Sequence, residues 1–369
     1  MPGLPSRQDL IRDLPRLALT LALAGAGGTL FALAGLPVPW ISGPMIVVAI
    51  AALFEAPVDI PRWLREIVFF FLGINIGSAV TPEALAGVVT WPASLLVLVI
   101  GLPVLVAGCA LPLVRWRGWR RDDALMASMP GALSLILALA DATDADVPRI
   151  ALVQAVRVAI LVALVPPMIS LTSGVDLTAA LPQHAIPGVS EIALLVVAGL
   201  AATALIRLTR FPAAGLMGAL VASAALHATD VVTAVMPNWL LMSAFAVLGA
   251  GIGARFAGMG WRRFRSGLFD AVMTFAIGFA ISLATAIVAT VWLGFPFGQT
   301  VLAFSPGAFE AMVVLAFLLG IDAAYVGAHH TVRFVALVLL APVVFRRRPG
   351  NSNGNGDGSG DGAGGPTAS

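Results

Sequence analysis

Long apolar runs separated by short polar segments fill most of the chain. A helix needs roughly 17–25 apolar residues to cross the hydrocarbon core of a bilayer. The strands of a membrane barrel would instead alternate apolar and polar positions over about ten residues, and these runs do not alternate. The pattern predicts an all-α polytopic membrane protein. The predicted apolar helices cover residues 17–34, 38–54, 66–81, 91–113, 124–140, 148–171, 189–206, 211–228, 239–254, 267–293, 299–319 and 323–345.

The two ends of the chain differ from this apolar body. Residues 1–16 carry Arg7, Arg12 and Arg16 before the first long run, which predicts a cytoplasmic segment followed by a retained membrane anchor. Residues 346–369 are dominated by Gly, Ser, Asn and Asp, a composition typical of a disordered polar tail.

The composition excludes a soluble enzyme, since 59% of the residues are hydrophobic and 11% are charged. All 21 basic residues are Arg, in short clusters between apolar runs, so we expect no direct binding to nucleic acid. One cysteine and four histidines argue against a metal site. The sequence offers no nucleophile with a nearby base, so we predict neither enzymatic activity nor a cofactor.

An internal repeat divides the chain into two halves. A shift of 176 residues aligns positions 61–166 with the second half without gaps, and a shift of 175 continues the match upstream. The sequence therefore predicts two membrane repeats, residues 17–172 and 189–345. The matched pairs include Gly73 with Gly249, Gly77 with Gly253, Asp146 with Asp322 and Arg157 with Arg333.

The arginine clusters predict that the two repeats are inverted. Arg115–Arg121 follow the fourth run, whereas the equivalent loop at 293–298 has no arginine. Arg255–Arg265 follow the ninth run, whereas the equivalent loop at 81–90 has none. Because positive loops lie on the cytoplasmic side, equivalent loops lie on opposite sides, and each repeat crosses the membrane an odd number of times.

Each repeat then contains about five crossing helices and one re-entrant or broken helix. The runs at 124–140 and 299–319 contain Pro130-Gly131 and Pro306-Gly307, and these residues interrupt a membrane helix. Ten crossings remain, so the prediction is a multi-pass protein of the bacterial inner membrane with both termini in the cytoplasm.

Two arginines fall within predicted crossing helices, where a charge is costly and normally faces a bundle interior or a wet cavity. Arg157 and Arg333 are repeat equivalents, and inverted repeats can bring such residues to one site near the midplane. A guanidinium group binds a carboxylate or phosphate through two parallel hydrogen bonds. Gln154 and His330 lie one turn earlier on the same faces. The alternative is a structural lock, in which each arginine pairs with an acidic residue: Asp146, Asp322 or Glu310.

The breaks at Pro130-Gly131 and Pro306-Gly307 can direct free N–H groups of the following half-helix at the same anion, although a simple kink is the alternative. Glu310 has no acidic equivalent in the first repeat, which suggests one protonatable group for coupling; a neutral or arginine-paired Glu310 is the alternative. Asp146 and Asp322 each precede a helix, where capping is the first interpretation and ion coordination the second.

Two glycine pairs, Gly73 with Gly77 and Gly249 with Gly253, have the GxxxG spacing of closely packed membrane helices. Asn75 lies between the first two glycines, within an apolar run. Its polar side chain is a candidate for the lining of a cavity.

Several motifs together resemble the AbrB family of bacterial inner-membrane proteins, which contain a duplicated membrane domain. They are Gly43-Pro44-Met45, Leu72–Gly77, Met129–Ala132, Gln154–Arg157 after Asp146, and Ser305–Ala308 with Asp322 and Arg333. Members usually have a second glycine where this chain has Ala132 and Ala308, and glutamine where it has His330. The resemblance implies either a regulator of gene expression or an ammonia monooxygenase, the two labels that members carry, but the sequence has no copper or iron ligand set for the second.

The residues favour a secondary transporter that moves a small anionic, carboxylate-like solute by alternating access. The alternative is an AbrB-type membrane regulator or sensor that affects gene expression indirectly. The expected partners are the lipid bilayer and the solute, and the sequence also allows a homo-oligomer.

Overall fold

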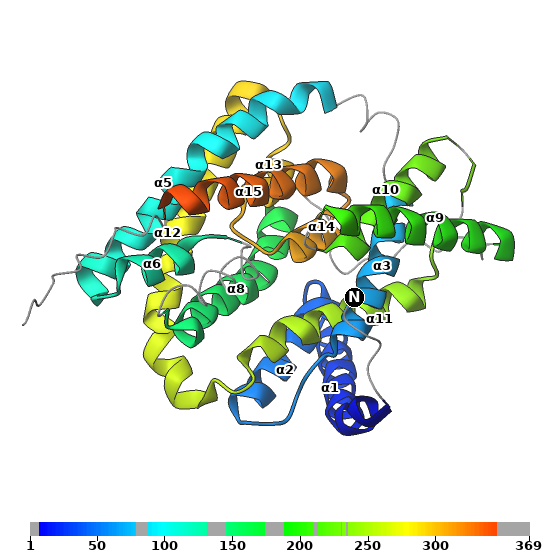
Figure 1. Cartoon of the computed structure of the whole chain (residues 1–369), viewed down its shortest axis with the longest axis horizontal. Coiled ribbons are helices and arrows are strands. Elements are labelled where there is room, and N and C mark those ends of the chain that lie inside the picture. Colours follow the sequence, from blue (N-terminus) through cyan, green and yellow to red (C-terminus); the bar gives the residue numbers. More distant parts are fainter. Residues whose placement is uncertain are drawn as a thin grey trace, which may run out of the picture.

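The computed structural model describes residues 7–78, 88–130, 145–173, 188–209, 213–229, 231–233 and 235–344. Every regular element in these ranges is helical, which confirms the all-α prediction (Figure 1). The elements of the first half are α1 (Arg7–Leu33), α2 (Pro39–Leu53), α3 (Arg62–Ser78), η1 (Val88–Thr90), α5 (Trp91–Arg117), α6 (Arg121–Ser128) and α8 (Val147–Ser173). Those of the second half are α9 (Val189–Leu208), α10 (Ala214–Ala228), α11 (Asn238–Gly253), η2 (Ala254–Phe256), α12 (Gly260–Leu293), α13 (Phe297–Phe304), α14 (Phe309–Leu318) and α15 (Ala323–Val344).

Seven helical segments within these ranges are long and apolar enough to cross a bilayer. They lie in α1, α5, α8, α9, α11, α12 and α15, while α2, α10 and α14 are shorter apolar helices. The chain is therefore a polytopic helical membrane protein. The ten crossings and the opposite orientation of the two halves stay predictions.

Some helix boundaries differ from the apolar runs. Helix α1 begins at Arg7, so part of the predicted N-terminal segment is helical. The run predicted at 299–319 consists of two helices, α13 and α14, with a break between them. The run predicted at 124–140 is described only as far as Pro130, and both Gly131 and the tail at 346–369 lie outside the described residues.

The helices recur at the spacing of the sequence repeat. Helix α13 begins and ends 176 residues after α6, and α10 begins and ends 175 residues after α2, which are the two shifts of the sequence repeat. Gly118 and Gly294, which are repeat equivalents, end α5 and α12 in a left-handed conformation with φ of 65° and 76°. Val38 and Ala213, also equivalents, precede α2 and α10 with φ of 48° and 57°. Such values are unusual for residues with a side chain, so the duplication has kept a strained backbone feature in both halves.

The helices form two bundles, each with members from both halves (Figure 1). We call α1–α3 with α9–α11 the first bundle, and α5, α6, α8 and α12–α15 the second bundle. Within each bundle the helices pack extensively, whereas contacts between the bundles are confined mainly to α3 with α14, α8 with α11, and α2 with α8 and α12. The main apolar core runs through both bundles, and a smaller cluster that includes Ile74 and Leu195 lies between α3 and α9.

The GxxxG glycines allow close helix contacts in the first bundle, as their spacing predicts. A Cβ atom on Gly73 would lie 2.3 Å from the carbonyl oxygen of Leu216 in α10. A Cβ atom on Gly249 would lie at the same distance from the carbonyl oxygen of Ile41 in α2. Each half thus contributes one of these glycine helices, which packs against a helix of the other half.

Candidate functional site

The second Pro-Gly motif breaks a helix inside the protein, as predicted. Helix α13 ends at Phe304 and α14 begins at Phe309. Ser305 and Ala308 are extended, with ψ of 137° and 139°, and Pro306 has no N–H to continue the helical ladder. Ser305 through Ala308 are buried. The last carbonyl groups of α13 therefore lose their helical partners within the core.

The first Pro-Gly motif begins in the same way. Helix α6 ends at Ser128, and Met129 is extended with ψ of 120°. Pro130 follows in a buried turn.

Arg333 of α15 binds the break between α13 and α14. Its Nη1–H donates to the carbonyl of Ser305 at 2.6 Å, and its Nη2–H donates to the carbonyl of Gly307 at 3.0 Å. Nη2 also lies 2.6 Å from Nδ1 of His330, whose Nε2 lies 3.0 Å from the carbonyl of Leu302. Because a guanidinium group only donates, Nδ1 is the acceptor, and His330 is a neutral imidazole with its proton on Nε2.

Arg157 of α8 binds the end of α6 in a related way. Its Nη1–H and Nη2–H donate to the carbonyls of Ala127 at 3.2 Å and Met129 at 3.1 Å. Gln154 donates from Nε2 to the carbonyl of Met126 at 3.2 Å. Gln154 with Met126 is the repeat equivalent of His330 with Leu302, and Arg157 with Met129 is that of Arg333 with Ser305, so two contacts occur in both halves.

These four side chains explain how a helix can end in an apolar interior. The final carbonyl groups of a helix lack backbone partners and carry the negative end of the helix dipole. Without water, each unpaired group costs several kcal/mol. The arginines supply both donors and positive charge at these carbonyls, and they are almost fully buried, with 2% and 3% exposure for Arg157 and Arg333.

The acceptors of both arginines differ from those of the structural lock that the sequence allowed. Backbone carbonyls take the place of Asp146, Asp322 and Glu310 as the acceptors. Within the described ranges, neither Arg157 nor Arg333 forms a salt bridge. Both guanidinium groups are buried, so each half contributes one positive charge to the interior. The Nε–H of Arg157 has no hydrogen-bond partner in the described part of the chain.

The three acidic residues have other surroundings. Oδ1 of Asp146 accepts from the backbone N–H of Arg149 at 3.1 Å, and Oδ1 of Asp322 accepts from those of Ala324 and Tyr325 at 2.9 and 3.1 Å. This is the capping geometry that the sequence predicts for both residues. Burial raises the pKa of the Asp322 carboxyl above its ordinary value, although the two N–H groups oppose this effect.

Glu310 lies in the first turn of α14 and is half-buried. Its charge acts on Arg255 of η2, a short helix that packs against α2 and α11 of the first bundle. Its role in coupling stays a prediction.

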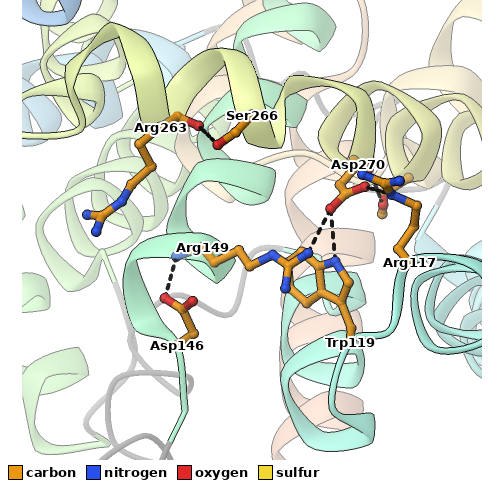
Figure 2. A network of polar contacts seen from close by, with 8 residues as sticks. Arg117, Trp119, Asp146, Arg149, Arg263, Ser266 and Asp270 are labelled. Atoms are coloured by element: carbon orange, nitrogen blue, oxygen red, sulfur yellow. Dashed lines mark hydrogen bonds and ion pairs between the residues drawn. The ribbon is translucent and has the colours of Figure 1, made fainter.

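Sequence reasoning missed a cluster around Asp270 of α12 (Figure 2). Trp119 Nε1–H and Arg149 Nη2–H donate to Oδ2 of Asp270 at 2.9 and 3.0 Å, and Arg117 Nε–H donates to Oδ1. The guanidinium of Arg149 also lies 3.9 Å from the centre of the Trp119 ring. The carboxylate is 1% exposed and joins α5, α8 and α12. An aspartate near the start of the apolar run predicted at 267–293 was the signal that could have indicated this cluster.

Metal ligands do not gather in the part of the chain that the structure describes, where no three His, Cys, Asp or Glu side chains come together.

The fold and the site define a class of protein: a multi-pass helical membrane protein in which two core helices, α6 and α13, end in the interior and are held there by buried arginines of α8 and α15. Comparison with known proteins gives the family. A sequence profile described as "Transition state regulatory protein AbrB" matches residues 40–348, and the chain belongs to this AbrB family.

Two curated relatives match most of the chain. "Putative regulator AbrB" of Escherichia coli K12 is 27% identical, over 84% of this chain and 90% of its own length. "Uncharacterized protein YhjN" of Bacillus subtilis 168 is 24% identical, over 92% of this chain and 94% of its own length.

Proposed function

We propose that the protein is a secondary transporter for a small anionic solute that carries a carboxylate-like group. The observation that supports this proposal is the pair of buried guanidinium groups, one from each half, with no carboxylate bound to either among the described residues. Buried charges are normally paired, and an anionic solute would compensate them.

The contacts with the broken helices leave donors for a solute. A guanidinium group has five N–H bonds in a fixed fork. Arg157 uses two of its nitrogens for carbonyl groups, and its Nε–H is unpaired in the described structure. An anion can therefore bind to Arg157 while the helix break stays bound.

The two-bundle arrangement supports a route for alternating access. Helix α8 carries Arg157, and helix α14 directly follows the second break. Both are among the few elements of the second bundle that contact the first. Rigid rocking of one bundle against the other would change access on the two sides of a site at this boundary. In this proposal the halves are inverted, the membrane is the bacterial inner membrane and both termini are cytoplasmic.

The test compares two variants at each arginine. Arg157→Lys and Arg333→Lys keep the charge, whereas Arg157→Gln and Arg333→Gln keep a neutral donor for a carbonyl. Purified protein is screened by thermal shift against small carboxylates and phosphates, and a ligand at 100 times its Kd stabilises by about 2.7 kcal/mol. We expect a hit in the wild type that both glutamine variants lose, with the lysine variants retaining a weaker shift. A hit that persists in both glutamine variants would show that the charges serve only the fold.

A second candidate function is regulation, because the family description and the printed name of the Escherichia coli relative both refer to a regulator. A regulator would bind the solute at the same two arginines without transporting it across the membrane. Uptake of the radiolabelled thermal-shift ligand into proteoliposomes separates the two candidates. Accumulation above empty liposomes supports transport, and ligand binding without uptake supports the regulator.

A further inference from the structure

Asn75 of α3 is a polar side chain buried without partners. It is 0% exposed, and neither Nδ2 nor Oδ1 has a hydrogen-bond partner among the described residues. Buried amides in proteins are nearly always paired, since an unpaired donor or acceptor carries its full desolvation penalty. The unpaired amide of Asn75 therefore destabilises the fold unless a bound partner compensates it.

Helix geometry places the amide on the side of α3 that faces away from α10. Gly73 and Gly77 contact α10, where added Cβ atoms would lie 2.3 and 2.4 Å from the carbonyl oxygens of Leu216 and Leu220. Each helical residue advances about 100° around the axis, so Asn75 lies on the side of α3 away from α10. The remaining neighbours of α3 are mainly α11 and α14. Helix α14 directly follows the break that Arg333 binds.

The equivalent position in the second half is Gly251 of α11. An added Cβ atom there would meet no heavy atom within 4 Å. Gly249 and Gly253 pack against α2, so Gly251 faces away from α2 as Asn75 faces away from α10. The duplication thus places an amide on one helix and open space on the helix that packs beside it.

The chemistry of an amide differs from that of the arginines in one respect. An arginine offers only donors, whereas Asn75 offers a donor and an acceptor side by side. A carboxylate, or a phosphate without a bound proton, presents only acceptors and cannot satisfy Oδ1, and the ammonium group of an amino acid presents only donors and cannot satisfy Nδ2–H. A hydroxyl group both donates and accepts, so it satisfies both atoms of the amide.

We propose that Asn75 lines the solute cavity and binds a hydroxyl group of an anionic solute whose charged group the arginines bind. The proposal rests on the proposed binding of an anion. It assigns the solute to the small hydroxy acids, and it makes Asn75 a specificity-determining residue.

The first test asks whether the amide faces a water-filled space. The chain has a single cysteine, Cys109, so Cys109→Ala gives a cysteine-free background. Asn75→Cys, Gly251→Cys and Ile74→Cys are placed in it and treated in membranes with a small anionic methanethiosulfonate. We expect Asn75→Cys and Gly251→Cys to react and Ile74→Cys, which belongs to the smaller apolar cluster, to stay unlabelled. An unreactive Asn75→Cys variant overturns the proposal whatever the arginines do.

The second test uses pairs of acids that differ by one hydroxyl group, lactate with propionate and malate with succinate. We expect the wild type to bind the hydroxy acid of one pair more tightly by about fivefold or more, and Asn75→Leu to lose this preference. Equal binding of both acids by the wild type, with loss of binding in the arginine variants, overturns the role of Asn75 and leaves the anion site intact. Binding of neither pair overturns this proposal, and the broader carboxylate and phosphate screen then decides the proposed function separately.

Discussion

The Asp270 cluster predicts a large loss of stability when its carboxylate is removed. Three donors converge on Asp270, and hydrogen bonds to a charged group contribute about 1.5–3 kcal/mol each. Removal of one partner from a buried ion pair costs about 3–5 kcal/mol. The side chains of Arg117 and Arg149 are 38% exposed, so water replaces part of what they lose. We therefore expect Asp270→Ala to lower the free energy of unfolding by about 2–4 kcal/mol.

Further substitutions separate the contributions of the individual donors to this loss of stability. Trp119→Phe keeps the ring under the Arg149 guanidinium but removes the indole N–H, and we expect it to lose about 1.5 kcal/mol. Asp270→Asn combined with Arg149→Met forms a double-mutant cycle, which isolates the pairwise interaction of the two side chains.

The assay is equilibrium unfolding in mixed micelles, with Arg207→Met as the matched control. Arg207 forms an ion pair with Glu66 at 2.7 Å, but both side chains are more than half exposed. An exposed pair of this kind contributes about 0–1 kcal/mol. If Asp270→Ala loses no more than Arg207→Met, the cluster does not stabilise the fold and the reasoning is wrong.

Three other predictions concern packing, capping and topology. Gly249→Ala forces a Cβ atom against the backbone of α2 and should destabilise by about 1–3 kcal/mol, whereas Gly251→Ala enters open space and should leave the melting temperature unchanged or higher. Asp322 has a raised pKa in the folded state, so its contribution to stability falls as the pH rises through about 4 and above. Asp322→Asn keeps a capping oxygen but does not titrate, so we expect a pH series of melting curves to lose this dependence in the variant. Reporter fusions at residues 82–86 and 257–259 should report opposite sides of the membrane, and the same side for both would refute the inverted halves.

The sequence predicted the helices and the helix break because each depends on local chemistry. Apolar runs of membrane length specify helices, and Pro306 with Gly307 interrupts one of them. The glycine contacts of Gly73 and Gly249 also follow from spacing alone. The cap at Asp322 follows from its place directly before a helix.

The partners of the buried charges depend on tertiary structure, so the local sequence pattern does not predict them. The sequence shows that Arg157 and Arg333 need acceptors, but a carboxylate and a helix-ending carbonyl satisfy that need equally. The choice depends on where the end of α13 meets α15, which no local pattern encodes. Asp270 illustrates the same limit, since its partner Arg149 lies in another helix, 121 residues away in the chain.

The Asp270 cluster also shows how the two halves have diverged. The repeat shift relates Asp270, Trp119 and Arg149 to Ser94, Phe295 and Tyr325. The second set also comes together: Tyr325 lies 5.1 Å from the Phe295 ring, and Ser94 Oγ lies 2.9 Å from Nε2 of His329, whose ring is 3.9 Å from Tyr325. The duplication has therefore kept the positions that meet and changed what meets there, from an ionic cluster in one place to an aromatic and histidine cluster in the other. Salt weakens partly exposed ion pairs and has little effect on stacked rings. We therefore expect added salt to weaken the ionic cluster around Asp270 more than its aromatic and histidine equivalent, even though the helices around the two clusters are repeat equivalents.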